Sequence, residues 1–395
     1  MDRPPRPPRP SWQPGLLAPL AVGVTLVANV AARALPLDHV SYRVWEALRT
    51  FGAATPFRPD ARYDRPRVYG NLAALGNQPD MREYHRVTFT TDALGYHNPP
   101  ALAAGTGPRP GALLFGSSFS AGTEVSDGQD VAARLGALTG RPVYNAAPSD
   151  PAPATVEALA RRVGLDGGVV IFEYFEGSNP PALADRAPDP RALRCRKALG
   201  AWDAPATCDV FSWVTDRLDV SPLQVFAARL HRRAQNGVLL PNDAAARILR
   251  APLANGSELL FLADERAILH RERDVAAAVR YFAWLADRLA QQGGGLSLLV
   301  VLAPQKYTVY APLLVPPDPG PDASLEYLAE IERRLAERRI AVVNLAAPLR
   351  AAARTALDRD SLIYWRDDTH WNAAGNEIAA RLIAPILEEL WGNAR

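Results

Sequence analysis

The amino-acid sequence predicts an α/β protein with a three-layer α/β/α architecture and about five parallel strands. Short apolar runs such as ALLF (112–115) and GVVIFEYF (168–175) are typical of strands that are buried on both faces of a sheet. Segments with helical periodicity separate these runs. Strands that alternate with helices pair in parallel through right-handed crossovers, so the pattern favours one open parallel sheet.

The elements follow one another along the chain with one long interruption. The predicted strands are 112–115, 142–145, 168–175, 296–303 and 340–345. The predicted helices are 127–139, 151–163, 273–291, 323–338, 346–356 and 373–391. Asp127 is the expected N-cap of the first helix, and Asp150 with Pro151 opens the second. Between about 180 and 265, prolines, arginines and both cysteines mix with short helical pieces, which indicates an insertion or cap.

The first residues are typical of a segment that reaches a membrane. MDRPPRPPRP is a basic tail, and residues 15–32 carry no charge over about the length that crosses a bilayer once. We expect residues 1–37 to be a tail and signal-anchor helix in the inner membrane, with the rest extracytoplasmic. The alternative is secretion after cleavage at Ala32-Arg33-Ala34. Residues 38–110 are then a juxtamembrane segment, and 111–395 form the main domain.

Composition does not favour nucleic-acid binding, and it leaves two possible states for the two cysteines. The net charge of +2 comes from 44 basic and 42 acidic residues, a balance that does not favour nucleic-acid binding. In an oxidising compartment, Cys195 and Cys208 could form a disulfide across a short loop; the alternative is two buried free thiols. No metal-ligand spacing accompanies the cysteines, and no cofactor is predicted.

Two short motifs contain residues suited to nucleophilic catalysis. GSSFS (116–120) directly follows an apolar strand, but a serine hydroxyl needs a base to become a nucleophile. Among the six histidines, His370 stands out because Asp367 and Asp368 precede it. A carboxylate beside an imidazole fixes its tautomer and stabilises the imidazolium that forms when it takes a proton. The alternative is that both aspartates cap the final helix.

GSSFS together with DDTHWNAAG (367–375) resembles the SGNH/GDSL hydrolase superfamily, in particular the branch that includes the alginate O-acetyltransferases. The resemblance covers about residues 88–180 and 295–390. It implies an SGNH-like catalytic domain within 111–395. It also implies that Ser118 is the nucleophile, His370 the base and Asp368 the orienting carboxylate, with Asp367 as the alternative.

The resemblance also implies residues that contact the oxyanion or the substrate. The backbone N–H of Ser118 and the side chain of Asn179 match the oxyanion donors, and the Ala147 N–H is a further candidate. The remaining substrate-binding candidates lie near strand ends or beside the histidine: Lys306, Tyr310, Trp371 and Asn145. Pro180 stands where the family usually has an aspartate. In open parallel sheets, ligands bind at the carboxyl ends of the strands, where most of these residues fall.

These expectations combine into a membrane-tethered O-acetyltransferase that acts on a cell-envelope or secreted polysaccharide through an acyl-enzyme. A separate multi-span membrane protein would supply the acyl group. Two alternatives remain open at this stage. The same triad would serve a carbohydrate esterase that removes acetyl groups, and the same fold would serve a non-catalytic glycan-binding or assembly protein.

Overall fold

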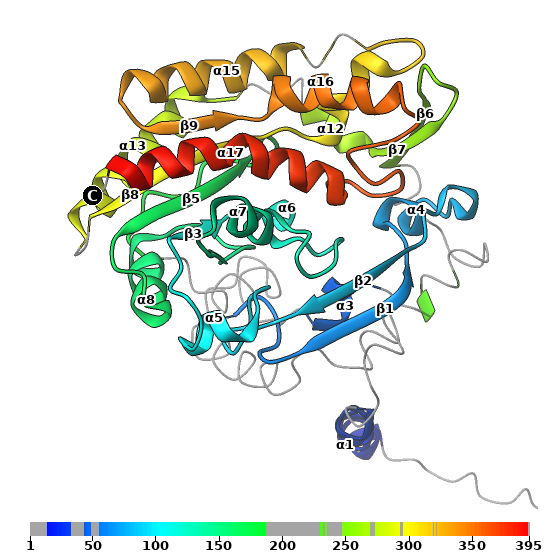
Figure 1. The fold of residues 1–395 in the computed structure, drawn as a ribbon. Coiled ribbons are helices and arrows are strands. Elements are labelled where there is room, and N and C mark those ends of the chain that lie inside the picture. Colours follow the sequence, from blue (N-terminus) through cyan, green and yellow to red (C-terminus); the bar gives the residue numbers. More distant parts are fainter. Residues whose placement is uncertain are drawn as a thin grey trace, which may run out of the picture.

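Figure 1 shows the computed structural model of the chain. The structure describes residues 14–32, 43–48, 55–186, 230–231, 234, 247–268, 273–292, 295–318, 320 and 322–393. Cys195 and Cys208 lie outside the described residues, so their pairing stays a prediction.

Within the described residues, five parallel strands form the central sheet in the order β4-β3-β5-β8-β9. Their bounds are β3 (Ala112–Phe115), β4 (Val143–Asn145), β5 (Gly168–Phe175), β8 (Leu296–Ala303) and β9 (Ala341–Asn344). β5 and β8 pair along their full length, from Gly168 opposite Leu296 to Phe175 opposite Ala303. The predicted parallel sheet is therefore confirmed, and each strand lies within one residue of its expected bounds.

Helices cover both faces of this sheet and complete the three layers (Figure 1). One face packs against α7 (Val131–Thr139), α16 (Ala346–Leu357) and α17 (Ala373–Asn393). The other packs against α8 (Pro153–Val163), α13 (Val275–Gln291) and α15 (Asp322–Glu337). Side chains alternate along β5, so Val169 and Ile171 enter the first layer while Val170 and Phe172 enter the second. A strand with two apolar faces needs this double cover.

Two helix starts differ from the prediction. α7 begins after Asp130, whose side chain accepts the Ala133 N–H at 3.1 Å. Asp127 instead accepts bonds from Thr90. α8 begins after Ala152, which provides no side-chain cap. On sequence grounds, aspartates three residues apart at one helix start are equivalent caps. Here Asp127 binds Thr90 instead, which leaves Asp130 to cap the helix.

The residues before the main domain pack against it. Their elements are α3 (Val44–Leu48), β1 (Arg62–Val68), α4 (Asn71–Leu75), η1 (Pro79–Met81), β2 (His85–Thr90) and α5 (Pro100–Ala104). β1 and β2 form an antiparallel pair. Tyr63 and Phe89 of this pair pack with Ala121 and Ala147 of the main domain. The hairpin therefore lies against the segments that follow β3 and β4.

The described part of the insertion contains a second small hairpin. Its strands are β6 (Ile248–Pro252) and β7 (Glu258–Leu262), which pair antiparallel and lead into α12 (Ala263–Ile268). Leu260 of β7 packs against Leu72 of α4. The short elements α6 (Ser118–Ala121), α14 (Lys306–Tyr310) and η3 (Ala311–Leu313) follow strand ends.

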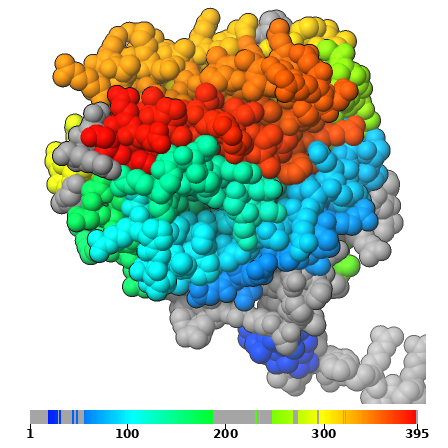
Figure 2. Space-filling model, in the orientation of Figure 1, coloured from blue at the N-terminus to red at the C-terminus, as the bar shows by residue number. Residues whose placement is uncertain are grey.

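Helix α1 (Pro14–Ala32) stands apart from the rest of the described chain in Figure 2. It exposes large apolar side chains, including Leu20, Val27 and Val30. Across the described residues, the structure contains no helix whose length and apolarity would suffice to cross a membrane. The single-pass anchor is therefore not confirmed.

Candidate active site

Ser118 and His370 meet at the carboxyl edge of the central sheet. Ser118 opens α6, three residues after Phe115 ends β3. His370 lies in the loop between α16 and α17, which passes over the same edge. This edge is where open α/β sheets bind ligands.

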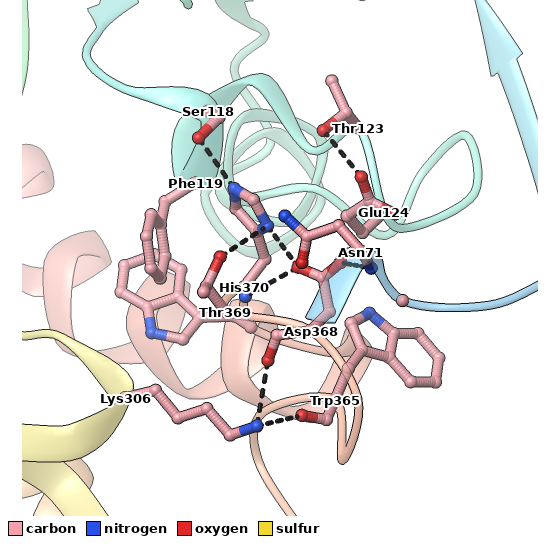
Figure 3. A network of polar contacts seen from close by, with 12 residues as sticks. Asn71, Ser118, Phe119, Thr123, Glu124, Lys306, Trp365, Asp368, Thr369 and His370 are labelled. Atoms are coloured by element: carbon pink, nitrogen blue, oxygen red, sulfur yellow. Dashed lines mark hydrogen bonds and ion pairs between the residues drawn. The ribbon is translucent and has the colours of Figure 1, made fainter. Parts of the chain in front are cut away.

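The structure brings the three predicted triad residues into one hydrogen-bonded row (Figure 3). His370 Nε2 lies 2.7 Å from Ser118 Oγ, and His370 Nδ1 lies 2.5 Å from Asp368 Oδ1. The Asp368 side chain is 1% exposed and that of His370 is 14% exposed. One imidazole nitrogen thus faces the hydroxyl and the other faces the carboxylate, which is the geometry needed to move a proton away from Ser118.

The charges at this row favour a protonated ring. Burial alone would lower the pKa of His370, but the charge and hydrogen bond of Asp368 outweigh it and raise the pKa above its usual value. Burial would conversely raise the pKa of Asp368, and the contact with His370 instead keeps it well below the usual range. Asp368 therefore stays ionised and stabilises the imidazolium.

The two aspartates have different contacts, which separates the leading assignment from its alternative. Asp368 Oδ2 accepts the Asn71 N–H at 2.7 Å, and its other oxygen faces His370. Asp367 Oδ2 accepts the N–H groups of Gly70 and Glu83 at 2.8 and 2.9 Å. Asp367 therefore ties the segment before the main domain to the histidine loop.

Neither aspartate caps the final helix, which was the competing interpretation of this motif. Asn372 Oδ1 accepts the N–H groups of Ala374 and Gly375 there. Gly70 allows the close approach to the histidine loop, because a Cβ at this position would lie 2.1 Å from the Asp367 carbonyl oxygen. A side chain at residue 70 would push the loop and its aspartates away.

The turn that contains the serines, residues 116–120, is held against β5 by a buried carboxyl group. Glu173 Oε2, on β5, accepts the Ser117 N–H and the Ser117 hydroxyl, both at 2.8 Å. It also accepts the Ser120 hydroxyl at 3.2 Å. Burial raises the pKa of Glu173 to about 7, although these bonds oppose the shift. Gly116 has a φ of 156°, and a Cβ there would lie 2.6 Å from Glu173 Oε2. The glycine thus permits the contact between the turn and β5.

Comparison with known protein families gives a match over part of the chain. Residues 257–394 match the SGNH hydrolase-like domain of acetyltransferase AlgX. The matched residues include Asp368 and His370, while Ser118 lies before them. No curated protein and no solved structure gives a significant match. The match confirms the resemblance seen in the sequence motifs and supports an enzyme of the hydrolase or acyltransferase kind.

The three oxyanion donors named from the sequence have different contacts in the structure. Within the described part of the chain, the Ser118 N–H at the start of α6 has no protein acceptor. Asn179 is exposed and lines a cavity of about 120 Å³ together with Gly116, Ser117 and Phe175. The Ala147 N–H, in contrast, donates to Asn145 Oδ1 at 3.0 Å. Ala147 is therefore not available as a third donor.

Lys306 is not placed at a substrate surface. Its side chain is completely buried, and Nζ donates to the carbonyl oxygens of Leu260, Trp365, Arg366 and Asp368 at 2.7–3.0 Å. Burial lowers its pKa to about 8, against the opposing charge of Glu265. Lysine is required here because a compact ammonium can face several carbonyls at once, which a planar guanidinium cannot. Lys306 therefore fixes the backbone that carries Asp368 (Figure 3).

Replacing Lys306 with methionine should lower the free energy of unfolding by roughly 3–5 kcal/mol. The variant leaves buried carbonyls without a donor and Glu265 without its buried cation. Urea unfolding followed by circular dichroism measures the change. As a control, Arg161→Met removes an exposed cation from α8 and should cost about 1 kcal/mol at most. Equal unfolding midpoints for Lys306→Met and the wild type would contradict this role.

The other substrate-binding candidates also have structural positions. Tyr310 is buried, and its hydroxyl accepts the Ile363 N–H at 3.0 Å. Trp371 is 2% exposed and packs edge-on against Phe119, with ring centroids 5.0 Å apart, so it offers no open stacking wall. The Asn145 amide donates to the Ser120 carbonyl at 2.8 Å. These residues support the site from within.

Three residues of the site were not predicted from the sequence. Glu173 had a usable signal, because it is the only charged residue in the eight-residue strand β5. Asn71 contributes only its backbone N–H, for which its side chain gives no indication. Glu124 follows the serine turn and is buried beside His370, with no motif around it.

Proposed function

We propose that this chain is an acyltransferase that moves an acetyl group onto hydroxyl groups of a polysaccharide through an acyl-enzyme at Ser118. The observation that carries the proposal is the row Ser118 Oγ, His370, Asp368, with contacts of 2.7 and 2.5 Å. The match to an acetyltransferase domain supports acetyl as the transferred group. The polysaccharide acceptor rests on the resemblance of the GSSFS and DDTHW motifs.

The proposed mechanism has two half-reactions. In the first, His370 Nε2 takes the Ser118 proton, Oγ attacks the acetyl carbonyl, and the leaving group receives that proton. In the second, a sugar hydroxyl gives its proton to His370 and attacks the acyl-enzyme, which returns Ser118 to its free form. The Ser118 N–H and the Asn179 side chain stabilise the oxyanion in both. One such donor is typically worth about 2.7–4 kcal/mol of transition-state stabilisation.

We further propose that the domain works outside the cytoplasm and receives its acyl group from a separate membrane-spanning protein. The uncharged run of residues 15–32 after an arginine-containing tail supports export, either with a retained anchor or after signal cleavage. Binding of the full-length chain to inner-membrane fractions, compared with its release into the medium, distinguishes the two routes.

The proposal is tested by following the fate of the acetyl group. The full-length chain is incubated with p-nitrophenyl acetate and a deacetylated oligosaccharide, and both the sugar and the solution are analysed by mass spectrometry. Acetylated sugar in amounts that exceed the His370→Ala control supports transfer. Free acetate alone would replace the proposal by an esterase, and no turnover of either kind would replace it by a glycan-binding protein.

A further inference from the structure

A second buried carboxyl group approaches the imidazole of His370. Glu124 follows α6, after Gly122 closes that helix in the left-handed conformation with a φ of 66°. After this turn, Glu124 lies close to His370. Glu124 is 4% exposed, and its Oε2 has no hydrogen-bond partner in the described part of the chain. Its Oε1 has only a long contact of 3.5 Å with the Thr123 hydroxyl.

Glu124, Asp368 and His370 form one compact group. One polar atom of each lies within 4.8 Å of the others. Figure 3 shows Glu124 beside Asp368, on the side of the ring that faces away from Ser118. An unpaired buried carboxyl oxygen is costly unless a charge or a donor compensates it. His370 in its protonated form is such a charge.

The charged groups near the His370 ring determine whether its positive charge is compensated. Arg43 acts on Glu124, Asp368 and His370, and it offsets one of the two carboxylates. A positive imidazole then balances the second carboxylate. Further from the ring, the buried Lys306 and Asp367 carry opposite charges. His85, near Asp368, has a pKa that burial lowers, which disfavours its charged form.

We propose that Glu124 is a positioning residue for His370: with Asp368, it balances the charge that the imidazole gains when it takes the Ser118 proton. Asp368 orients the ring through a hydrogen bond, whereas Glu124 acts through its charge from a second direction. The kinetic consequence rests on the proposed function, but the electrostatic one does not. Burial and the neighbouring Asp368 raise the pKa of Glu124 to about 7, into the range where imidazoles ordinarily titrate.

Titration of the His370 ring by NMR tests the proposal without any turnover. The His370→Ala spectrum assigns the signal among the six histidines. Glu124→Gln removes one negative charge beside the ring, so the pKa of His370 should fall by about one unit or more. Glu176→Gln is the matched control, because Glu176 is equally buried but bonds to Arg273 and Thr308 instead. An unchanged His370 pKa in folded Glu124→Gln would overturn the proposal.

The wild-type chain supplies a second test, which holds even if Glu124→Gln fails to fold. Two coupled groups titrate in two macroscopic steps. The His370 signal should therefore show its own main step and a smaller one from Glu124. A single simple step over the whole pH range would contradict the coupling.

Kinetics then connect the charge to catalysis. The base must be neutral to accept the Ser118 proton, so a lower His370 pKa should move the acid limb of kcat/KM to lower pH in Glu124→Gln. Glu124→Asp keeps the negative charge, so the acid limb of its kcat/KM profile should stay at the wild-type pH. If the His370 pKa measured by NMR shifts in Glu124→Gln but the acid limb of kcat/KM does not move, the catalytic part of the proposal is overturned. Absence of turnover in the wild type, with the NMR shift intact, would instead count against the proposed function.

Discussion

Replacing Ser118 with alanine is expected to lower kcat for p-nitrophenyl acetate hydrolysis on the order of 10⁵–10⁶-fold. The variant removes the only hydroxyl that bonds to His370 Nε2 in the described part of the chain. Without this hydroxyl, no acyl-enzyme forms at residue 118. The remaining oxyanion donors can then assist only the direct attack of water on the ester. Release of p-nitrophenol, corrected for the uncatalysed reaction, measures the loss.

The matched control for this prediction is Ser126→Ala. The Ser126 hydroxyl bonds to the backbone of β2, at Thr88 N–H and the Arg86 carbonyl, away from His370. Its activity should stay near that of the wild type. Because Ser118 Oγ donates to no structural group other than His370 among the described residues, Ser118→Ala should also unfold near the wild-type temperature. Substantial activity in folded Ser118→Ala would remove Ser118 from the mechanism.

Replacing Asp368 with asparagine is expected to lower kcat about 10⁴-fold with little change in fold. The amide keeps the shape of the carboxylate, but it no longer stabilises the imidazolium and no longer fixes the reactive tautomer. Because the carboxylate raises the pKa of His370, its loss should also move the acid limb of kcat/KM to lower pH. The pH dependence of ester hydrolysis measures both effects.

Asp367→Asn provides the comparison that separates the two aspartates of the motif. Asp367 accepts backbone N–H groups at Gly70 and Glu83 and does not contact the ring. Its variant should lose stability, since an amide replaces a carboxylate that accepts two buried donors, while kcat falls much less than in Asp368→Asn. A larger kcat loss in Asp367→Asn would transfer the orienting role to Asp367.

The sheet could be predicted because its strands are apolar over their whole length. ALLF and GVVIFEYF have no polar side to present to solvent, so helices must cover both faces. The start of α7, in contrast, does not follow from the local sequence. Asp127 and Asp130 are equally good caps locally, and only the contact between Asp127 and Thr90 decides which one is used.

The triad residues could be named from two motifs, but their supports could not. Asn71 and Asp368 are 297 positions apart in the sequence, and their contact involves a backbone N–H. Lys306 illustrates the same limit: it could be named as a candidate near a strand end, whereas its partners are carbonyl oxygens that any residue carries. Ala147 fails as an oxyanion donor because Asn145 takes its N–H.

The proposed acyl-enzyme is tested by quenching the full-length chain in acid shortly after mixing with p-nitrophenyl acetate and mapping its peptides by mass spectrometry. We predict one acetyl group on the peptide that contains Ser118, and its loss when a deacetylated oligosaccharide is present before the quench. Acetyl groups on other residues only, or an unmodified Ser118 while p-nitrophenol accumulates in a burst, would contradict nucleophilic catalysis by Ser118.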